Sequence, residues 1–305
     1  MPLLQEEISN GGPEVLKAKL LLGTFHVLTK QLPKALEVLT TVIEEANQET
    51  DKKVIINALV KRGSLYIQQC QDPKNDAVLS FADFDRAAEL DPANADVFFN
   101  RGQINLLMDK FEAAKEDLAR AAQLREDFAL ANVQNLYTKF LGSQLSGDTS
   151  VLQEVEQQFQ AAVARYPDCV EVYALYAKLL QETGKLQEAD ELYRKGLEVN
   201  PENANLMVYR ALLYLQQTGD ADKALKDMNV AVKLDDKCEF AYETIGQIEI
   251  QRGNLEAAAS AFRKAIPLVN TELEMAHLFG LSESASAKIL ARKKLQEVPT
   301  GNTNN

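Results

Sequence analysis

VEVYALYAKLLQETGKLQEADELYRKGLEVNP, residues 170–201, is the stretch that decides the fold, because it holds two amphipathic helical patterns joined by a turn. Its first half spaces apolar residues three and four apart, which places them in one stripe along a helix. Gly184 interrupts this pattern, and the second half repeats the stripe. The chain must leave helical geometry at Asn200, because the residue before a proline is pushed toward extended backbone. The stretch is therefore predicted to form a helical hairpin.

The order of large and small residues in this hairpin resembles the tetratricopeptide repeat. Small residues stand where the two helices cross closely, and bulky ones fill the space between them. The positions that carry the resemblance are Tyr173, Ala177, Leu180, Ala189, Tyr193, Gly196 and Pro201. Such a hairpin has two apolar faces and cannot bury both alone, so neighbouring copies are expected.

The rest of the chain divides into further copies of the hairpin. The pattern predicts about seven, over residues 16–54, 56–94, 95–128, 129–169, 170–203, 204–237 and 239–270. A C-terminal capping helix is expected over residues 271–298, because the last repeat would otherwise expose its apolar face to water. The predicted fold is all-α, a right-handed α-solenoid over residues 14–298.

Glycine and small polar residues mark the segments outside the regular repeat. Residues 1–13 contain two glycines and a proline near their end and are predicted to be a flexible N-terminal segment. Residues 299–305 are predicted to be a disordered tail. Two stretches are longer than the repeat requires: residues 71–75 are predicted to form an inserted turn, and residues 142–150 an exposed loop.

The composition restricts the class of partner. The chain has 305 residues and a formal net charge of −12. We expect no nucleic-acid partner, because phosphate binding requires clustered Lys and Arg, and basic partners are favoured instead. Cys70, Cys169 and Cys238 are widely spaced, which fits buried thiols in a reducing compartment. The sequence contains neither a long apolar run nor a signal-peptide pattern, so this chain is expected to be soluble, without a membrane span.

The sequence gives little support for enzymatic chemistry. His26 and His277 are the only histidines and lie at opposite ends of the array. A histidine-based metal site or a nucleophile–histidine pair is therefore not expected within one chain. No glycine-rich phosphate loop is present. The carboxylates follow the spacing of solvated helix surfaces. We expect no catalytic residue, no metal, no cofactor and no enzymatic activity.

Stacked hairpins create a concave groove, because a small rotation per repeat turns the first helices of successive hairpins toward one surface. In tetratricopeptide arrays this groove is lined by first-helix positions two, five, six, nine and twelve. The candidate binding residues at these positions are Asp96, Phe99, Tyr137, Glu171, Leu175, Val208, Tyr209, Leu212, Phe240, Glu243 and Gln247. This mixture of apolar groups and carboxylates suits a basic amphipathic helix. The alternative is that some of the apolar residues pack against neighbouring repeats or the last helix.

Several segments resemble one family more closely than they resemble a generic repeat. CVEVYALYAKLL, DDKCEFAYETIGQIEIQRGN and TELEMAHLFGL, beginning at residues 169, 235 and 271, are similar to the C-terminal half of the seventy-kilodalton import receptors of the mitochondrial outer membrane. ALVKRGSLYIQQ and LDPANADVFFNRGQ, beginning at residues 58 and 90, are similar to the same family. The resemblance covers residues 14–294.

The resemblance implies a receptor on the cytosolic face of the mitochondrial outer membrane. Such a receptor accepts precursor proteins from chaperones and passes them, with other import-complex subunits, to the import pore. Acidic and aromatic groove residues of the family fall on Glu171, Phe240 and Glu243. The family's membrane anchor and its separate chaperone clamp have no counterpart in this sequence, where Lys61 and Ser64 approach the clamp pattern most nearly. We therefore expect the precursor-binding portion only, with chaperone docking confined to the missing clamp.

Two functions from different classes follow. The first is a non-enzymatic receptor module that binds mitochondrial precursors in its groove. The alternative is a tetratricopeptide-repeat scaffold, or a co-chaperone adaptor, that organises other cytosolic proteins through its convex side or its loops. A third possibility, an enzyme subunit whose catalytic domain is missing, has no residue in its favour.

Overall fold

The structure is a computed structural model that describes residues 2–11, 14–69, 73–269 and 272–296. The described chain contains α-helices, one short 3-10 helix and no strands, which confirms the all-α prediction. The helices are α1 (Pro2–Asn10), α2 (Val15–Leu28), α3 (Leu32–Glu45), α4 (Lys52–Gln69), α5 (Pro73–Leu90), α6 (Ala95–Leu107), α7 (Phe111–Leu124), α8 (Ala129–Ser146), η1 (Thr149–Val151), α9 (Leu152–Arg165), α10 (Val170–Glu182), α11 (Leu186–Val199), α12 (Ala204–Thr218), α13 (Ala221–Leu234), α14 (Glu239–Arg252), α15 (Leu255–Ala265) and α16 (Glu272–Gln296).

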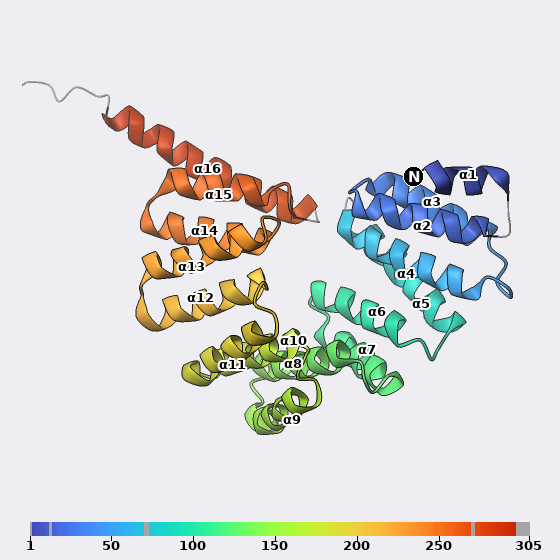
Figure 1. Cartoon of the computed structure of the whole chain (residues 1–305), viewed down its shortest axis with the longest axis horizontal. Coiled ribbons are helices and arrows are strands. Elements are labelled where there is room, and N and C mark those ends of the chain that lie inside the picture. The colour runs from blue at the N-terminus through green and yellow to red at the C-terminus, as the bar shows by residue number, and fades with distance from the viewer. Residues whose placement is uncertain (1, 12–13, 70–72, 270–271, 297–305) are drawn as a thin grey trace, which may run out of the picture. The chain divides into compact units, whose positions relative to one another are not determined.

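The helices form two compact units, unit 1 (residues 1–166) and unit 2 (residues 167–305). Figure 1 shows consecutive helices running back and forth as hairpins within each unit. In unit 1 the paired helices are α2 with α3, α4 with α5, α6 with α7 and α8 with α9. In unit 2 they are α10 with α11, α12 with α13 and α14 with α15, and α16 packs on α15. The first helices of neighbouring hairpins also touch directly, α2 with α4, α4 with α6 and α12 with α14, so that each unit builds a surface from successive first helices.

The N-terminal stretch differs from the prediction of a flexible segment. Residues 2–10 form α1, which packs against α2. Leu4 and Ile8 are half-buried and lie four residues apart, which is the spacing of an apolar stripe on a helix. This stripe covers α2, which has no preceding hairpin to pack on it. The helix ends before Gly11, whose φ of +67° is the left-handed conformation that terminates helices. Residues 12–13 lie outside the described chain.

The described parts of the two predicted insertions are mostly helical. The helix α8 continues past Gly142 and ends at Gly147, whose φ is +70°, so the loop predicted over 142–150 is much shorter than expected. Gly142 lies inside α8, and a Cβ added to it would meet only a carboxylate oxygen of Glu112, at 3.8 Å. Residues 73–75, predicted to belong to an inserted turn, form the first turn of α5. Residues 70–72 and the predicted tail at 299–305 lie outside the described chain.

Close helix crossings depend on the small residue at position eight of the first helix. In unit 2, a Cβ added to Gly246 would stand 2.6 Å from the ring of Phe262 on α15. In unit 1, a Cβ added to Gly102 would stand 2.9 Å from Leu118 of α7. In these two hairpins the helices therefore approach so closely that an added methyl group would force a neighbouring side chain to move.

Arginines at position seven tie neighbouring helices of unit 1 together. Arg62 on α4 donates two hydrogen bonds to Asp83 on α5, at 2.8 and 2.7 Å, and one to Thr40 on α3 at 3.1 Å. Arg101 on α6 donates to Asp117 on α7 at 2.9 and 2.6 Å and to Asp85 on α5 at 2.7 Å. Each arginine thus joins its own hairpin to the preceding one with charge-assisted hydrogen bonds.

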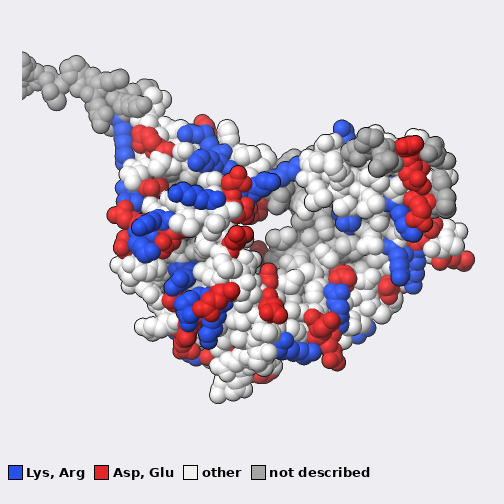
Figure 2. All heavy atoms as spheres, in the orientation of Figure 1, with Lys and Arg blue, Asp and Glu red and all other residues white. Residues whose placement is uncertain are grey.

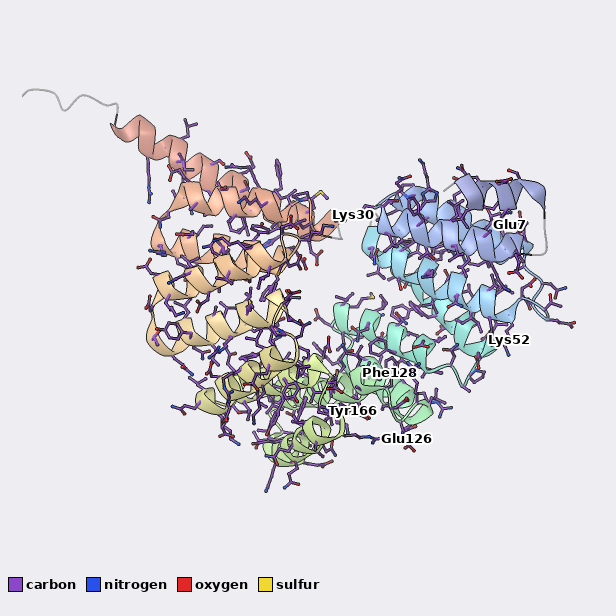
Figure 3. All side chains as sticks on the ribbon, in the orientation of Figure 1. Glu7, Lys30, Lys52, Glu126, Phe128 and Tyr166 are labelled. Carbon is purple, nitrogen blue, oxygen red and sulfur yellow. The ribbon has the colours of Figure 1, made fainter. Side chains whose placement is uncertain are left out.

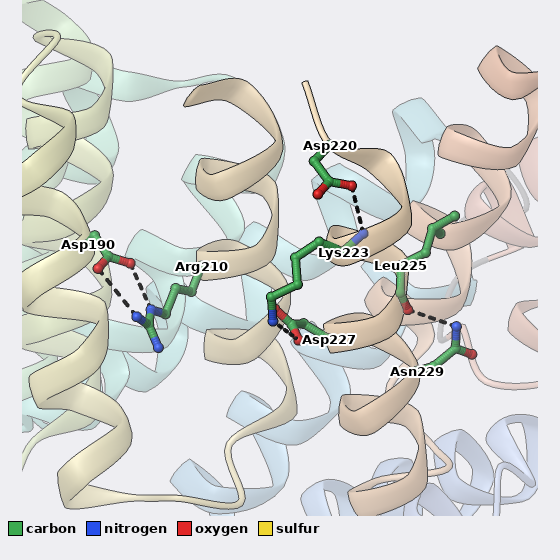
Figure 4. Close-up of polar contacts among 7 residues, drawn as sticks. All are labelled: Asp190, Arg210, Asp220, Lys223, Leu225, Asp227 and Asn229. Atoms are coloured by element: carbon green, nitrogen blue, oxygen red, sulfur yellow. Dashed lines mark hydrogen bonds and ion pairs between the residues drawn. The ribbon is translucent and has the colours of Figure 1, made fainter. Parts of the chain in front are cut away.

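Unit 2 has one arginine at the same position, and it makes a simpler contact. Arg210 on α12 donates to both carboxylate oxygens of Asp190 on α11, at 2.7 and 3.3 Å. Asp227 on α13 binds Lys223 at 2.8 Å instead (Figure 4). Arg210 therefore connects α12 to the preceding hairpin only.

Candidate functional site

An aromatic cluster lies on the first helices of unit 2. The ring of Tyr209 on α12 lies 4.9 Å from the ring of Phe240 on α14, centroid to centroid, and stacks at 6.3 Å on Tyr193 of α11. The Lys178 ammonium of α10 lies 5.6 Å from the Tyr209 centroid. Tyr209 and Phe240 are both half-buried. The two rings thus form an apolar surface that spans two hairpins and remains partly open to solvent.

Two carboxylates flank this aromatic cluster along the chain. Glu171 lies in the first turn of α10, where a negative charge is stabilised by the helix dipole, and its side chain is exposed. Glu243 on α14 is half-buried and accepts a hydrogen bond from Gln247 at 2.9 Å. Neither carboxylate is neutralised by an ion pair among the residues that the structure describes. Both can accept a basic group from a partner.

The remaining candidate residues of unit 2 differ in how deeply they are buried. Leu175 and Leu212 are half-buried and Gln247 is exposed, as a groove-lining position requires. Val208 is wrong as a groove residue, because it is completely buried. It packs in the core between α12 and α14 with Ala241 and Ile245. Position five of this helix faces the next first helix and not the solvent.

The candidates of unit 1 are engaged within the chain. The Asp96 carboxylate of α6 accepts a hydrogen bond from Arg125 at 2.7 Å. Phe99 packs on Phe128 with ring centroids 4.7 Å apart, and the Arg125 guanidinium covers Phe128 at 3.7 Å. Tyr137 on α8 is half-buried and lies 5.8 Å from Phe140. These contacts leave Asp96 without the free charge that the groove prediction assumed.

The junction after α7 shows why these side chains are held in place. The backbone carbonyl of Glu126 accepts hydrogen bonds from Arg165 at 3.0 Å and from the Tyr166 hydroxyl at 2.8 Å. Phe128, Glu126 and Tyr166 lie near one another in Figure 3. The end of α9 is thereby fastened to the loop between α7 and α8. The aromatic pair of unit 1 is consequently a structural contact of this junction.

Sequence reasoning missed a cavity in unit 1. It has a volume of about 440 Å³ and lies on the same faces of α2, α4 and α6 that first-helix groove positions predict. Lys61 and Ser64 of α4 line it, together with Asn57 and Asn100. Lys61, Ser64 and Asn57 occupy positions six, nine and two of α4, and Asn100 occupies position six of α6. The same position rule, applied to α4, would therefore have found this cavity. This side of unit 1 shows few charged side chains in Figure 2.

A second cavity lies in unit 2, away from the aromatic cluster. It has a volume of about 430 Å³ and is lined by α11, α12 and α13, with the Arg210–Asp190 pair at its edge. Leu197, Met207 and Tyr214 supply its apolar lining. Its lining shares no residue with the aromatic cluster.

The described residues provide no other reactive group. No cluster of three or more metal-ligating side chains occurs within them. Burial raises the pKa of the Cys169 and Cys238 thiols, which opposes the thiolate form that a nucleophile needs. None of the described helices is both long and apolar enough to cross a membrane.

Comparison with known proteins identifies the repeats and a set of relatives. Tetratricopeptide-repeat family models match residues 176–237, 95–128 and 241–268. The human mitochondrial import receptor subunit TOM70 is 40% identical over 289 residues, which cover 95% of this chain and 46% of the human protein. The subunit of the same name from Saccharomyces cerevisiae is 23% identical over 247 residues, 76% of this chain and 39% of the yeast protein. The chain spans about half the length of these relatives.

Solved structures support the fold. The crystal structure of yeast Tom70 superimposes with a TM-score of 0.69 at 19% identity, covering 97% of this chain and 61% of the yeast chain. A tetratricopeptide repeat protein from Parabacteroides merdae superimposes with a TM-score of 0.60 at 16% identity, covering 88% of this chain and 98% of the other. At these identities the matches establish an array of tetratricopeptide hairpins and no more.

Proposed function

The chain is an array of tetratricopeptide repeats related over 95% of its length to the C-terminal half of mitochondrial import receptor subunit TOM70, and from this relationship we propose that it binds mitochondrial precursor proteins. The observation that carries the proposal is the partly open Tyr209–Phe240 surface of unit 2, with carboxylates on α10 and α14 that no ion pair neutralises within the described chain. An aromatic surface bordered by negative charge fits a basic amphipathic helix, which presents an apolar stripe and a cationic face.

The binding step is a helix-in-groove contact. The apolar stripe of the precursor helix covers Tyr209, Phe240 and Leu212, which removes apolar surface from water. Its basic residues meet Glu171 and Glu243, which orient the helix and speed its approach more than they add affinity. Transfer to a downstream pore requires release, so micromolar affinity, about −8 kcal/mol, is sufficient.

The setting of this role is also a proposal. The module acts without enzymatic chemistry at the cytosolic face of the mitochondrial outer membrane. It receives precursors and passes them to other import-complex subunits and the import pore. Chaperones are expected to bind through a separate clamp, which is not assigned to these residues. Relatives named as mitochondrial import receptor subunits support this setting.

The proposal is tested by titrating the chain with a fluorescent basic amphipathic targeting peptide. Binding is expected to be micromolar and to weaken as salt is added, because exposed charge pairs are screened. Glu171→Arg should weaken peptide binding further, since the new positive charge repels the basic residues of the peptide. Glu188→Arg is the matched control, because Glu188 is an exposed carboxylate of the second helix α11. Unchanged binding after Glu171→Arg, or an equal loss in the control, would contradict the proposal.

The cavity between α11 and α13 favours a second candidate function. A scaffold would use this cavity, which residues of α11, α12 and α13 line, to hold a folded partner. Crosslinking in cytosol separates the two candidates. A receptor gives crosslinks to α10, α12 and α14, whereas a scaffold gives crosslinks to α11 and α13 that an excess of targeting peptide does not displace.

A further inference from the structure

The unit 1 cavity on α2, α4 and α6 has no part in the helix-binding step described above. Its lining combines apolar side chains with amides and hydroxyls, and it contains two charged residues, Lys61 and Asp96. We propose that this cavity is a subsite for the side-chain carboxylate of an Asp or Glu within a precursor segment, with Lys61 as the counter-charge. The identity of the partner rests on the proposed function, and the carboxylate chemistry rests on the cavity itself.

The ammonium group of Lys61 is the positive charge in this cavity that an anion could pair with. It lies half-buried in the middle of α4, and among the residues that the structure describes it makes no hydrogen bond and no ion pair. Lys19 and Lys17 of unit 1, by contrast, are paired with Glu45 at 2.5 Å and with Glu14 at 2.8 Å. A half-buried ammonium group without a counter-charge is less stable than a paired one. An arriving carboxylate would supply the missing partner.

The only other charge in the lining is already neutralised. The Asp96 carboxylate of α6 binds Arg125 at 2.7 Å. Arg125 follows α7 and is held over Phe128, so its guanidinium is fixed beside Asp96. The remaining lining residues are uncharged. The cavity therefore offers one uncompensated positive charge, which matches one carboxylate.

Neutral side chains around Lys61 can complete the hydrogen bonding of a carboxylate. Asn57 donates one amide hydrogen to the carbonyl of Lys53 at 3.0 Å, and Asn100 donates one to the carbonyl of Asp96 at 2.7 Å. Each side-chain amide carries two N–H donors, so each retains one. Gln68, half-buried in the same lining, has no hydrogen bond within the described chain. Donors from two helices thus line the same cavity as Lys61.

The apolar lining indicates a carboxylate inside a segment and not one at a chain end. Val60 and Leu65 line the cavity on either side of Lys61 along α4. Leu28 of α2, which is 78% exposed, extends this apolar lining on the neighbouring helix. A segment whose carboxylate reaches Lys61 can place apolar residues on both sides of it, whereas a chain end would leave one side empty. The class of ligand is an amphipathic segment with an acidic residue between apolar ones, which is distinct from a purely basic targeting helix.

The test compares three short fluorescent peptides of the same apolar sequence by anisotropy titration of the full chain. The first has a central Glu, the second a central Gln, and both are blocked at both ends. The third has the central Gln and a free C-terminal carboxylate. The Glu peptide is expected to bind about tenfold more tightly than the Gln peptide, since a charge-assisted pair in a half-buried site is worth about 1.4 kcal/mol. The third peptide is expected to bind like the second.

Variants of the chain assign the effect to Lys61. Lys61→Met should abolish the difference between the Glu and Gln peptides. Lys139→Met is the matched control, because Lys139 is a half-buried lysine on α8 that also lacks a partner within the described chain. It should leave the difference intact. Lys61→Glu should bind a peptide with a central Lys better than the one with Glu, and circular dichroism checks that each variant is folded.

Several outcomes overturn the subsite. Equal affinity for the Glu and Gln peptides, binding of none of the three, or an equal loss in Lys139→Met would each exclude it. Tight binding of the third peptide would assign the cavity to chain ends, against the proposal. Glu171→Arg and Phe240→Ala in unit 2 should leave the Glu–Gln difference unchanged. A failure of targeting-peptide binding in unit 2 is therefore distinguishable from a failure of this subsite.

Discussion

Unit 1 and unit 2 place different chemistry on equivalent positions of their first helices. At position six, unit 1 has Lys61 and Asn100 on adjacent first helices, whereas unit 2 has Leu175 and Tyr209. The repeat fixes where these side chains stand, because position six recurs on successive first helices, of which α4 touches α6 and α12 touches α14. Under the two proposals above, the residue type then decides what is bound: an acidic side chain beside polar amides in unit 1, and a basic amphipathic helix in unit 2. A repeat array can change its ligand without changing its fold.

The same two units differ in how their hairpins are held together. Arg101 in unit 1 reaches helices of two hairpins, and its principal partner Asp117 has a side chain only 7% exposed. Arg210 in unit 2 reaches one helix, and both it and Asp190 are 41% exposed. Buried charge pairs cost much when one partner is removed, and exposed ones cost little. The comparison therefore makes unequal predictions for the same substitution at the same repeat position.

The largest effect is expected from Arg101→Ala. The substitution leaves the Asp117 carboxylate buried, with only the amide of Asn105 at 3.0 Å to satisfy it. We expect a loss of about 3 kcal/mol in the free energy of unfolding, because an unpaired buried charge is left behind. Arg210→Ala, the matched variant in unit 2, should cost at most about 1 kcal/mol.

Amide hydrogen exchange read separately over the two units is the measurement for this pair. Arg101→Ala should raise exchange in α5 to α7, and Arg210→Ala should raise it weakly in α11 and α12. Equal losses in the two variants would show that burial does not govern these pairs.

The next effect concerns the glycine at position eight. Gly246→Ala brings a methyl group to 2.6 Å from the rigid ring of Phe262, which must move or distort the crossing. A cost of about 2 kcal/mol is expected, as for other overpacked cores. Gly102→Ala meets Leu118 at 2.9 Å, and a leucine side chain can rotate away, so its cost should be about half as large. Urea unfolding of both variants, followed by circular dichroism, measures the difference. The reverse order would mean that the ring of Phe262 yields more easily than the leucine.

A third, smaller effect separates the aromatic residues of the two units. Phe240→Ala removes half of the aromatic surface of unit 2 and should weaken targeting-peptide binding about tenfold, about 1.4 kcal/mol. Phe99→Ala removes a ring of unit 1 that packs on Phe128, so it should lower stability and leave peptide affinity unchanged. The same anisotropy titration measures the targeting-peptide affinity of both variants. Loss of affinity in Phe99→Ala alone would place the binding surface in unit 1.

Sequence analysis found the hairpins because small residues and apolar stripes recur at a fixed spacing, and spacing is a local property. It missed α1, because nothing in nine residues distinguishes a short covering helix from a flexible segment until α2 is there to be covered. It assigned Val208 to the groove, because the position rule describes an average repeat, whereas the contact of α12 with α14 buries this position. The cavity beside Lys61 lies at the same groove positions of α4 and α6, whereas the predicted groove candidates began only at α6. The binding roles of the other groove candidates remain predictions.

The smallest effect is a loss of stability at high pH that comes from unit 2. Burial raises the pKa of the phenols of Tyr173, Tyr193 and Tyr209. The folded chain then keeps these protons at a pH where the unfolded chain, with phenol pKa values near 10, has released them. Stability from this source is complete below about pH 10 and falls as pH rises above it, because the unfolded state binds fewer protons there.

Tyr193, which is completely buried, should contribute about 1 kcal/mol of this loss at about pH 10.5. Tyr193→Phe should therefore flatten the decline of unfolding free energy between about pH 9 and pH 11 in urea titrations. The substitution removes the weak 3.4 Å hydrogen bond to Gln181 but keeps the ring packed, so stability near neutral pH should hardly change. A decline as steep as that of the parent chain would mean that folding does not protect the Tyr193 phenol from ionisation.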